Sequence, residues 1–380
     1  MAALFFSTLP AALAPPAGTS PAWYFVCDPK FESSLSAEMA RAGIADTSFI
    51  EPGLLRTLQV LPSDDPLSHD YAYALQVLPS AAQIDASSIG ALQRGVLDHV
   101  AQHDAELRGA ARGALAVHSL VPDLLKGAPR PKARGLRRAE MLKAKLVSAL
   151  RAQYAAARPA ADGGELETER WLLQLMLLRP DCCLASLARV GHAELGTWPR
   201  ADAEAGLADV DIAEDMPSSA YRKLLEALSC AGIEVDSSTT RASRTAVDLG
   251  AHPGGWTTAL RRHGYGRVTA VDRQPLADRW LGGGVEFVQG DAFAFEPAEP
   301  PVALMASDVA AYPERVPELL ERWCSRRWAE DVVVTTKFTG EMPDFDTVDE
   351  ARRVAAAHGY KSRAKHFFNN KNELEIMLRL

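Results

Sequence analysis

A glycine-rich segment between an apolar run and an amphipathic pattern is the strongest signal for chemistry in the chain. Residues 248–256 read Asp-Leu-Gly-Ala-His-Pro-Gly-Gly-Trp. Glycine permits positive φ angles and close approach of a ligand to the backbone, and the start of a following helix offers unpaired N–H groups. The segment therefore predicts a cradle for a nucleotide-type ligand. Its candidate cofactor-binding residues are Asp248, Gly250, Pro253, Gly254, Gly255 and Trp256.

The spacing of these glycines differs from the dinucleotide pattern G-x-G-x-x-G, because His252 stands at the second glycine position. A nicotinamide or flavin cofactor is therefore disfavoured. We expect a side chain introduced at Gly254 to occupy ligand space. Asp272 ends the next predicted strand, 22 residues beyond Gly250, where a carboxylate can accept hydrogen bonds from ribose hydroxyls. Asp291 follows the third strand, and we expect it to hold an adenine edge together with Phe293.

Strands and helices must alternate over residues 216–380 to position these side chains. Apolar, β-branched runs predict strands at 245–249, 268–271, 285–288, 302–305 and 332–335. Helical patterns lie between them, which predicts a parallel sheet with right-handed crossovers. Residues 364–368 and 373–380 flank a polar turn and predict a final hairpin. We therefore expect a seven-stranded sheet with one antiparallel strand.

Segment 248–256 resembles the first motif of the FtsJ-type RNA ribose 2′-O-methyltransferases. The resemblance implies a Rossmann-like, seven-stranded class I methyltransferase domain over residues 216–380 that binds S-adenosyl-L-methionine. That family uses a Lys-Asp-Lys-Glu tetrad, and each member has a counterpart here. The matching residues are Lys223 in the helical segment 217–224, Asp308 after the fourth strand, Lys337 after the fifth and Glu373 in the last. Asp308 is also a candidate cofactor-binding residue.

The resemblance implies a role for each tetrad member. A ribose 2′-hydroxyl is a poor nucleophile until a base within hydrogen-bond reach removes its proton. We assign Lys337 as that base, with Asp308 to orient it, Lys223 to steer the phosphate or hydroxyl, and Glu373 to position Lys223 and the ribose. Lysine is protonated at neutral pH, so the pKa of Lys337 must fall. Burial and Lys223 lower it and the two acids raise it, and the sequence leaves the net direction open.

The N-terminal half narrows the resemblance to the RlmM type, in which a THUMP-like region precedes the catalytic domain and the target is a cytidine ribose of 23S rRNA. Segments 23–31, 177–184 and 217–227 carry this resemblance. It implies an α+β, ferredoxin-like RNA-binding region over residues 1–215. The chain departs from the pattern at His252 and over residues 62–118, which match nothing in the family.

Five elements are expected within residues 1–215. They are a strand at 23–27, an amphipathic helix at 31–43, a basic helix at 136–157, and two strands at 171–178 and 182–190, with a buried helix as the alternative for these short apolar runs. Segment 157–169 reads as a surface loop. The acidic segment 202–215 reads as a linker between the domains.

A local basic run provides the candidate RNA contact. Nine Lys or Arg residues lie between Lys126 and Arg151 against one acid, Glu140. Phosphate binding depends on such a local patch rather than on the formal net charge of −8. A solvated helix face is the competing interpretation. The candidate RNA-binding residues are Lys126, Arg130, Lys132, Arg134, Arg137 and Arg138.

Composition excludes several classes of protein. The 380 residues are 47% hydrophobic and 24% charged, as in globular proteins of two or three domains. The longest apolar runs are too short to cross a bilayer, and the first 18 residues lack the basic start of a secretory signal. Five cysteines, with Cys182 and Cys183 adjacent, favour a reducing compartment such as the cytoplasm. No Cys or His spacing suggests zinc, so we expect no metal.

Two alternatives of other classes stay open. A base or protein methyltransferase is disfavoured, because Asp308 is followed by Val-Ala-Ala rather than by Pro-Pro and an aromatic residue. A noncatalytic RNA-binding protein on a methyltransferase scaffold is the second alternative. The target nucleotide, the choice between naked RNA and a ribosomal precursor, and the oligomeric state are not determined by the sequence.

Overall fold

The chain divides into two compact units, each with its own sheet. The computed structural model describes residues 22–59, 71–125, 132–157, 170–193, 196–198, 200, 206, 210, 213, 215–233 and 244–380. The first unit comprises Met1–Ala193 and Thr197–Gly206, and the second comprises Glu194–Gly196 and Leu207–Leu380. The boundary at residue 215 and the THUMP-like character of residues 1–215 stay predictions.

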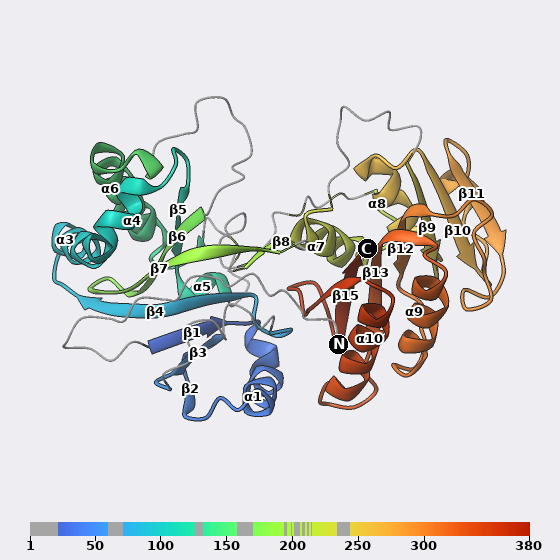
Figure 1. Ribbon diagram of the computed structural model, residues 1–380, viewed down its shortest axis with the longest axis horizontal. Coiled ribbons are helices and arrows are strands. Elements are labelled where there is room, and N and C mark those ends of the chain that lie inside the picture. Colours follow the sequence, from blue (N-terminus) through green and yellow to red (C-terminus); the bar gives the residue numbers. More distant parts are fainter. Residues whose placement is uncertain are drawn as a thin grey trace, which may run out of the picture. The chain divides into compact units, whose positions relative to one another are not determined.

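The first unit is built on one long mixed sheet (Figure 1). Its order is β2-β3-β1-β4-β7-β6-β5, and β8 pairs with β7. Residues 171–178 and 182–190 lie in two antiparallel strands, which excludes the buried helix considered for them. The strands are β1 (Ala22–Val26), β2 (Thr47–Glu51), β3 (Leu54–Thr57), β4 (Gln76–Asp85), β5 (Leu115–Leu120), β6 (Arg170–Arg179), β7 (Cys182–Ala193) and β8 (Gly196–Trp198).

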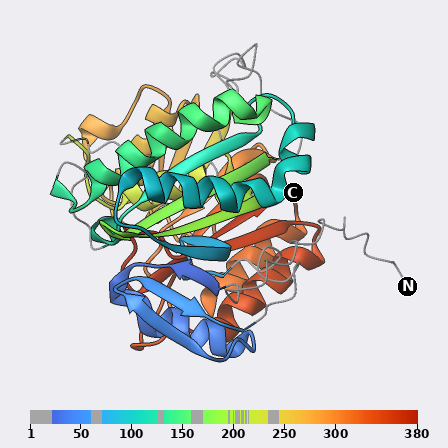
Figure 2. The ribbon, with the colours of Figure 1, turned by 90° about the vertical axis from the view of Figure 1, so that its left-hand side faces the viewer.

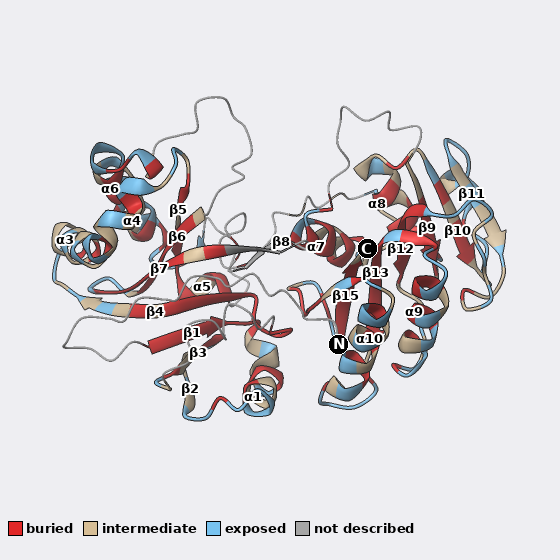
Figure 3. Ribbon diagram, viewed as in Figure 1, coloured by how far each residue is buried: buried red, intermediate tan, exposed pale blue. Residues whose placement is uncertain are grey.

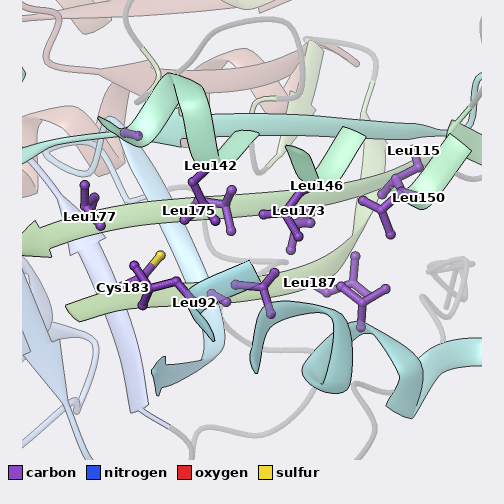
Figure 4. Close-up of a cluster of buried hydrophobic side chains, with 14 of the residues drawn as sticks. Leu92, Leu115, Leu142, Leu146, Leu150, Leu173, Leu175, Leu177, Cys183 and Leu187 are labelled. Atoms are coloured by element: carbon purple, nitrogen blue, oxygen red, sulfur yellow. The ribbon is translucent and has the colours of Figure 1, made fainter. Parts of the chain in front are cut away.

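Two helices, α3 and α6, lie across one face of this sheet (Figure 2). Figure 4 shows Leu142, Leu146 and Leu150 of α6 directed toward Leu173 and Leu175 of β6, in an apolar core. The leucines recur at helical spacing, so one face of α6 is buried and its basic face is left exposed. The helices are α1 (Glu32–Arg41), α3 (Ile89–Val100), α4 (Asp104–Gly109), α5 (Pro122–Leu125) and α6 (Leu136–Gln153).

Helix α6 ends four residues before the predicted end at residue 157. Tyr154 takes an extended backbone conformation, with φ −121° and ψ 132°, and its side chain is buried. Its hydroxyl donates a 3.0 Å hydrogen bond to Asp104 Oδ1. The tertiary contact of this tyrosine therefore stops the helix, and a short 3-10 turn, Ala155–Ala157, follows.

The second unit contains the predicted seven-stranded sheet, in the order β11-β10-β9-β12-β13-β15-β14. Strand β15 is antiparallel to both of its neighbours, and the other pairings are parallel, which confirms one antiparallel strand. The strands are β9 (Thr245–Leu249), β10 (Arg267–Asp272), β11 (Val285–Gln289), β12 (Val302–Ser307), β13 (Ala329–Lys337), β14 (Lys361–Lys365) and β15 (Glu373–Arg379).

Helices pack against this sheet in two contacting pairs, α7 with α8 and α9 with α10 (Figure 1). Their sheet-facing sides are buried and their outer sides are exposed (Figure 3). The helices are α7 (Tyr221–Ala231), α8 (Gly255–His263), α9 (Arg315–Ser325) and α10 (Phe345–Ala357). Among the described residues, no helix has the length and apolar character needed to cross a membrane.

The strand order reverses between β9 and β12. Strand β9 is followed along the chain by its neighbour β10 on one side, whereas β12 lies on its other side. Connections that leave these two adjacent strands in opposite directions open a crevice at their carboxyl ends, where ligands bind in open α/β sheets. The fold therefore places the predicted glycine loop and Asp308 at one edge.

Candidate active site

A cleft of about 490 Å³ lies at the carboxyl ends of β9, β10, β11 and β12. This volume is within the range of about 300 to 1,000 Å³ that is usual for small-ligand pockets. Of the predicted cofactor-binding residues, Gly250, Pro253, Gly255, Trp256, Asp272, Asp291 and Asp308 line it. Phe293 and Lys337 line it as well.

The loop after β9 requires glycine at two of its positions for different reasons. Gly250 has φ +83°, and a Cβ there would lie 2.8 Å from the backbone Cα of Val309. Gly254 has φ +110° at the start of α8, and a Cβ there would approach Leu276 and Trp280 at 3.6 and 3.5 Å. Gly254 does not line the cleft, and a Cβ there would point toward Leu276 and Trp280, so its contact with a ligand stays a prediction. Its constraint is the left-handed backbone conformation.

Asp272 accepts hydrogen bonds that hold the loop after β9 in place, and it presents a carboxylate to the cleft. Its Oδ2 accepts a 3.0 Å hydrogen bond from the His252 amide, and its Oδ1 accepts one of 2.8 Å from the Gln274 amide. Each oxygen has a second lone pair, because a carboxylate accepts at about four sites. The cleft therefore offers an acceptor for ligand hydroxyl groups beside the glycine loop.

Asp291 offers a second acceptor at the end of β11. Its Oδ1 accepts a 3.0 Å hydrogen bond from the Phe293 amide, and its Oδ2 accepts one of 2.7 Å from Arg273. The amide of Phe293 and the guanidinium of Arg273 hold the pKa of Asp291 below its ordinary value. The guanidinium of Arg315 lies 4.1 Å from the centre of the Phe293 ring. The ring that we expected to contact an adenine is thus held by a cation.

Asp248 lies beneath the cleft rather than on its surface. It is fully buried, and its Oδ2 accepts a 2.6 Å hydrogen bond from Thr257 Oγ1 of α8. Burial raises the pKa of Asp248 to about 7. The structure therefore assigns this predicted cofactor-binding residue a role in joining β9 to α8.

The four predicted tetrad residues come together beside the cleft. Lys223 Nζ lies 2.8 Å from Asp308 Oδ1 and 2.9 Å from Glu373 Oε1. Lys337 Nζ lies 2.9 Å from the same Asp308 oxygen and donates a 2.8 Å hydrogen bond to the Asp308 carbonyl. Their side chains are 4% exposed at Lys223 and 32% exposed at Lys337. Lys337 is therefore the lysine that a substrate in the cleft can reach.

Strand register explains why residues so distant in sequence meet. Lys337 is directly opposite Glu373 in the antiparallel pair of β13 and β15. Asp308 follows β12, which is parallel to β13 and adjacent to it. Lys223 comes from α7, and its Nζ lies 5.8 Å from the centre of the Trp256 ring, whose Nε1 donates a 2.9 Å hydrogen bond to the Ala220 carbonyl. Trp256 thereby supports the helix that carries Lys223.

Sequence reasoning missed a fifth ionisable group, Glu375. It is fully buried, and its Oε1 lies 3.8 Å from Lys223 Nζ. Burial raises the pKa of Glu375 to about 7. For Lys223, burial is the largest influence and lowers the pKa, but Glu375, Asp308 and Glu373 together raise it above its ordinary value. The alternation Glu-Leu-Glu in residues 373–375 is the signal that could have located it, since such residues share one face of a strand.

The basic run lies on the first unit. Lys132, Arg134 and Arg137 are exposed. Arg138 is half-buried and its Nε donates a 2.8 Å hydrogen bond to the Pro180 carbonyl. Lys126 and Arg130 lie outside the described residues. Within the described parts of both units, no group of three or more His, Cys, Asp or Glu residues could hold a metal ion.

With this geometry in view, the sequence can be compared with known families. Residues 216–352 match the FtsJ-like methyltransferase family. The resemblance stated above is therefore confirmed for this part of the chain. The FtsJ-like match includes Lys223, Asp308 and Lys337, and it ends before Glu373.

Curated relatives share one name, ribosomal RNA large subunit methyltransferase M, which supports the RlmM type. The Shewanella sp. (strain MR-4) protein is 30% identical over 181 residues, which are 46% of this chain and 50% of that protein. The Halorhodospira halophila protein is 31% identical over 189 residues, which are 50% of this chain and 54% of that protein. The chain thus spans about half the length of the curated relatives it matches.

A solved structure of TrmN from Thermus thermophilus is 14% identical to this chain. The alignment covers 94% of this chain and 99% of that chain, with a TM-score of 0.35. A similarity of that size supports no argument about this fold.

Proposed function

We propose that this chain is an S-adenosyl-L-methionine-dependent RNA methyltransferase that modifies a ribose 2′-hydroxyl, with a cytidine of 23S rRNA or its precursor as the target. The observation that carries the proposal is the Lys337–Asp308–Lys223–Glu373 cluster at the rim of the cleft. The FtsJ-like match and the name of the relatives support the reaction class and the RNA substrate.

The cleft has the features that the cofactor requires. S-adenosyl-L-methionine supplies an electrophilic methyl group on a sulfonium. Asp272 and Asp291 would accept hydrogen bonds from its ribose and adenine, and Phe293 would contact the ring. The absence of a side chain at Gly250 lets the loop after β9 pack against the backbone of Val309, and both residues line the cleft.

Lys337 is the general base of the proposed reaction. A neutral Lys337 amine accepts the proton of the 2′-hydroxyl at Nζ, and the resulting alkoxide character develops at the attacking oxygen. Asp308 holds Lys337 by two contacts, one from its side chain and one from its carbonyl. Holding the reacting atoms in line contributes up to about 7 to 11 kcal/mol in well-oriented systems.

The substrate RNA would contact the basic face of α6. Arg137 is exposed on that face, opposite the buried leucines, and Arg134 is exposed just before the helix begins. Such cations bind phosphates without reading the base sequence. The second unit would then supply the chemistry, and the first unit would hold the RNA.

The test is methyl transfer from isotopically labelled S-adenosyl-L-methionine to rRNA from cells that lack the gene. Digestion to nucleosides and mass spectrometry locate the label, which we expect on the ribose of a cytidine. A label on the base would contradict the 2′-O proposal. Binding of rRNA without any transfer, by a protein that binds the cofactor, would favour the noncatalytic RNA-binding alternative.

A further inference from the structure

Lys223 has three carboxyl groups around its ammonium, and only two of them belong to the predicted tetrad. Asp308 and Glu373 lie at hydrogen-bond distance, 2.8 and 2.9 Å. Glu375 lies 3.8 Å away on the same face of β15. At that distance Glu375 acts on Lys223 through charge rather than through a hydrogen bond.

Neighbouring polar side chains hold Glu375 in one orientation. Thr335 Oγ1 lies 2.9 and 3.1 Å from its two carboxyl oxygens, and Asn370 Nδ2 donates a 3.0 Å hydrogen bond to Oε1. Asn370 Nδ2 also lies 3.5 Å from Glu373 Oε1. The two glutamates are thereby linked through one amide. Full burial of a carboxyl group lowers the stability of the folded protein, because desolvation penalises its charged form.

Charged and titratable groups surround Glu375 on the elements packed against it. The cross-strand partner of Glu375 in β13 is Thr335, and Lys337 follows Thr335 by two residues. The cross-strand partner of Glu375 in β14 is Lys365. Lys365 and His366 are buried, as is Glu226 of α7. The surrounding groups are Lys223 and Glu226 on α7, Asp308 after β12, Lys337 on β13, Lys365 and His366 at the end of β14, and Glu373 on β15.

We propose that Glu375 is a positioning residue that holds Lys223 against Asp308 and Glu373, and that its charge influences the pH dependence of methyl transfer. This inference rests on the proposed function. The coupling runs through Asp308, because Oδ1 of that residue contacts both lysines. An ionised Glu375 favours the protonated form of Lys223, which shares Asp308 with Lys337, so removing its charge should move the pH dependence of transfer to lower pH. Burial raises the pKa of Glu375, so its charge changes at a higher pH than that of an exposed glutamate.

The test is the pH dependence of single-turnover methyl transfer for the wild type, Glu375→Gln and a matched control, Glu330→Gln. Glu330 is exposed on β13. In Glu375→Gln, we expect the rise in rate with pH to move to lower pH by about half a unit to one unit, the size of an effect from one nearby charge. The control profile should overlay that of the wild type. Because Glu375 does not line the cleft, affinity for S-adenosyl-L-methionine should stay within about twofold and reports correct folding.

A second variant and a second kind of measurement test the same proposal independently. Thr335→Val keeps the carboxyl group but removes its hydroxyl partner, so Glu375 holds its proton to higher pH and the profile shifts in the same direction, by less. Infrared difference spectra of the ligand-free protein should show protonated carboxyl absorption that disappears as the pH rises through neutrality, from Asp248 and Glu375 together, and Glu375→Gln should lose part of it.

The outcomes separate the two claims. Transfer by the wild type with an unshifted Glu375→Gln profile overturns the role of Glu375 and leaves the proposed function intact. Carboxyl absorption that Glu375→Gln retains at full wild-type intensity overturns it too. No transfer to ribose by the wild type overturns the proposed function, and the inference with it.

Discussion

The two units bury different kinds of side chain. Around Leu146 and Leu173, the core of the first unit is apolar. In the second unit, the side chains of Lys223, Asp248 and Glu375 are buried to a similar extent. Burying charge costs free energy that packing of apolar groups does not, so such clusters mark sites where chemistry requires them. This difference supports the proposal that the chemistry takes place in the second unit.

The largest effect that separates the units is expected at Leu146 of α6. Leu146→Ala removes a fully buried side chain from the first core and should lower the free energy of unfolding of that unit by about 2 to 5 kcal/mol. Denaturant unfolding measures this change. Affinity for S-adenosyl-L-methionine should not change, and a parallel loss of affinity would show that the units are not independent in function.

Stability should respond to pH with opposite sign in the two units. The folded pKa values of Asp248 and Glu375 are raised to about 7, above those of the unfolded chain, so their stabilisation is complete below about pH 4 and is lost as the pH rises through 7. In the first unit, burial lowers the pKa of His99 to about 4, so its contribution is lost as the pH falls from about 6.5 to 4.

Unfolding of the two units at a series of pH values tests these signs. Asp248→Asn should flatten the loss of stability of the second unit between about pH 4 and 7, by a few kcal/mol at most for one such group. The same variant should leave the first unit's profile unchanged. Equal slopes for wild type and Asp248→Asn would show that this carboxyl group does not hold a proton in the folded protein.

The sequence predicted the site of the second unit better than the fold of the first. Asp308, Lys337 and Glu373 were predictable at one edge because each lies at a strand end of the sheet, whereas Lys223, on α7, was predicted from the family resemblance alone. Glu375 was not, because a glutamate inside a strand reads as a surface residue until the antiparallel pairing with β13 and β14 is known. The end of α6 was mispredicted because the hydrogen bond between Tyr154 and Asp104 overrides helix propensity.

A smaller effect is expected at the rim of the cleft. Asp272→Ala removes the acceptor for cofactor hydroxyls and should weaken S-adenosyl-L-methionine binding by about 1 to 3 kcal/mol. Isothermal titration calorimetry measures the affinity. An unchanged dissociation constant in a folded variant would place the ribose elsewhere, and the carboxylate would then serve only the His252 and Gln274 amides.

The smallest effect is expected on the surface of the first unit. Charge reversal at Arg134 and Arg137 should flatten the salt dependence of RNA binding by roughly two phosphate contacts. Arg138 is less suitable, because it also holds the Pro180 carbonyl. Methyl transfer at saturating RNA should survive. Identical salt slopes for the variant and the wild type would identify the run as a solvated helix face.

The most direct test of the catalytic account is single-turnover methyl transfer by Lys337→Arg. Arginine keeps the positive charge beside Asp308 but does not lose its proton at accessible pH. The account predicts nearly intact S-adenosyl-L-methionine affinity and a rate about 100 to 10,000-fold below wild type, the usual contribution of a positioned base. A variant that retains more than about a tenth of the wild-type rate would contradict the account, because charge alone would then explain Lys337.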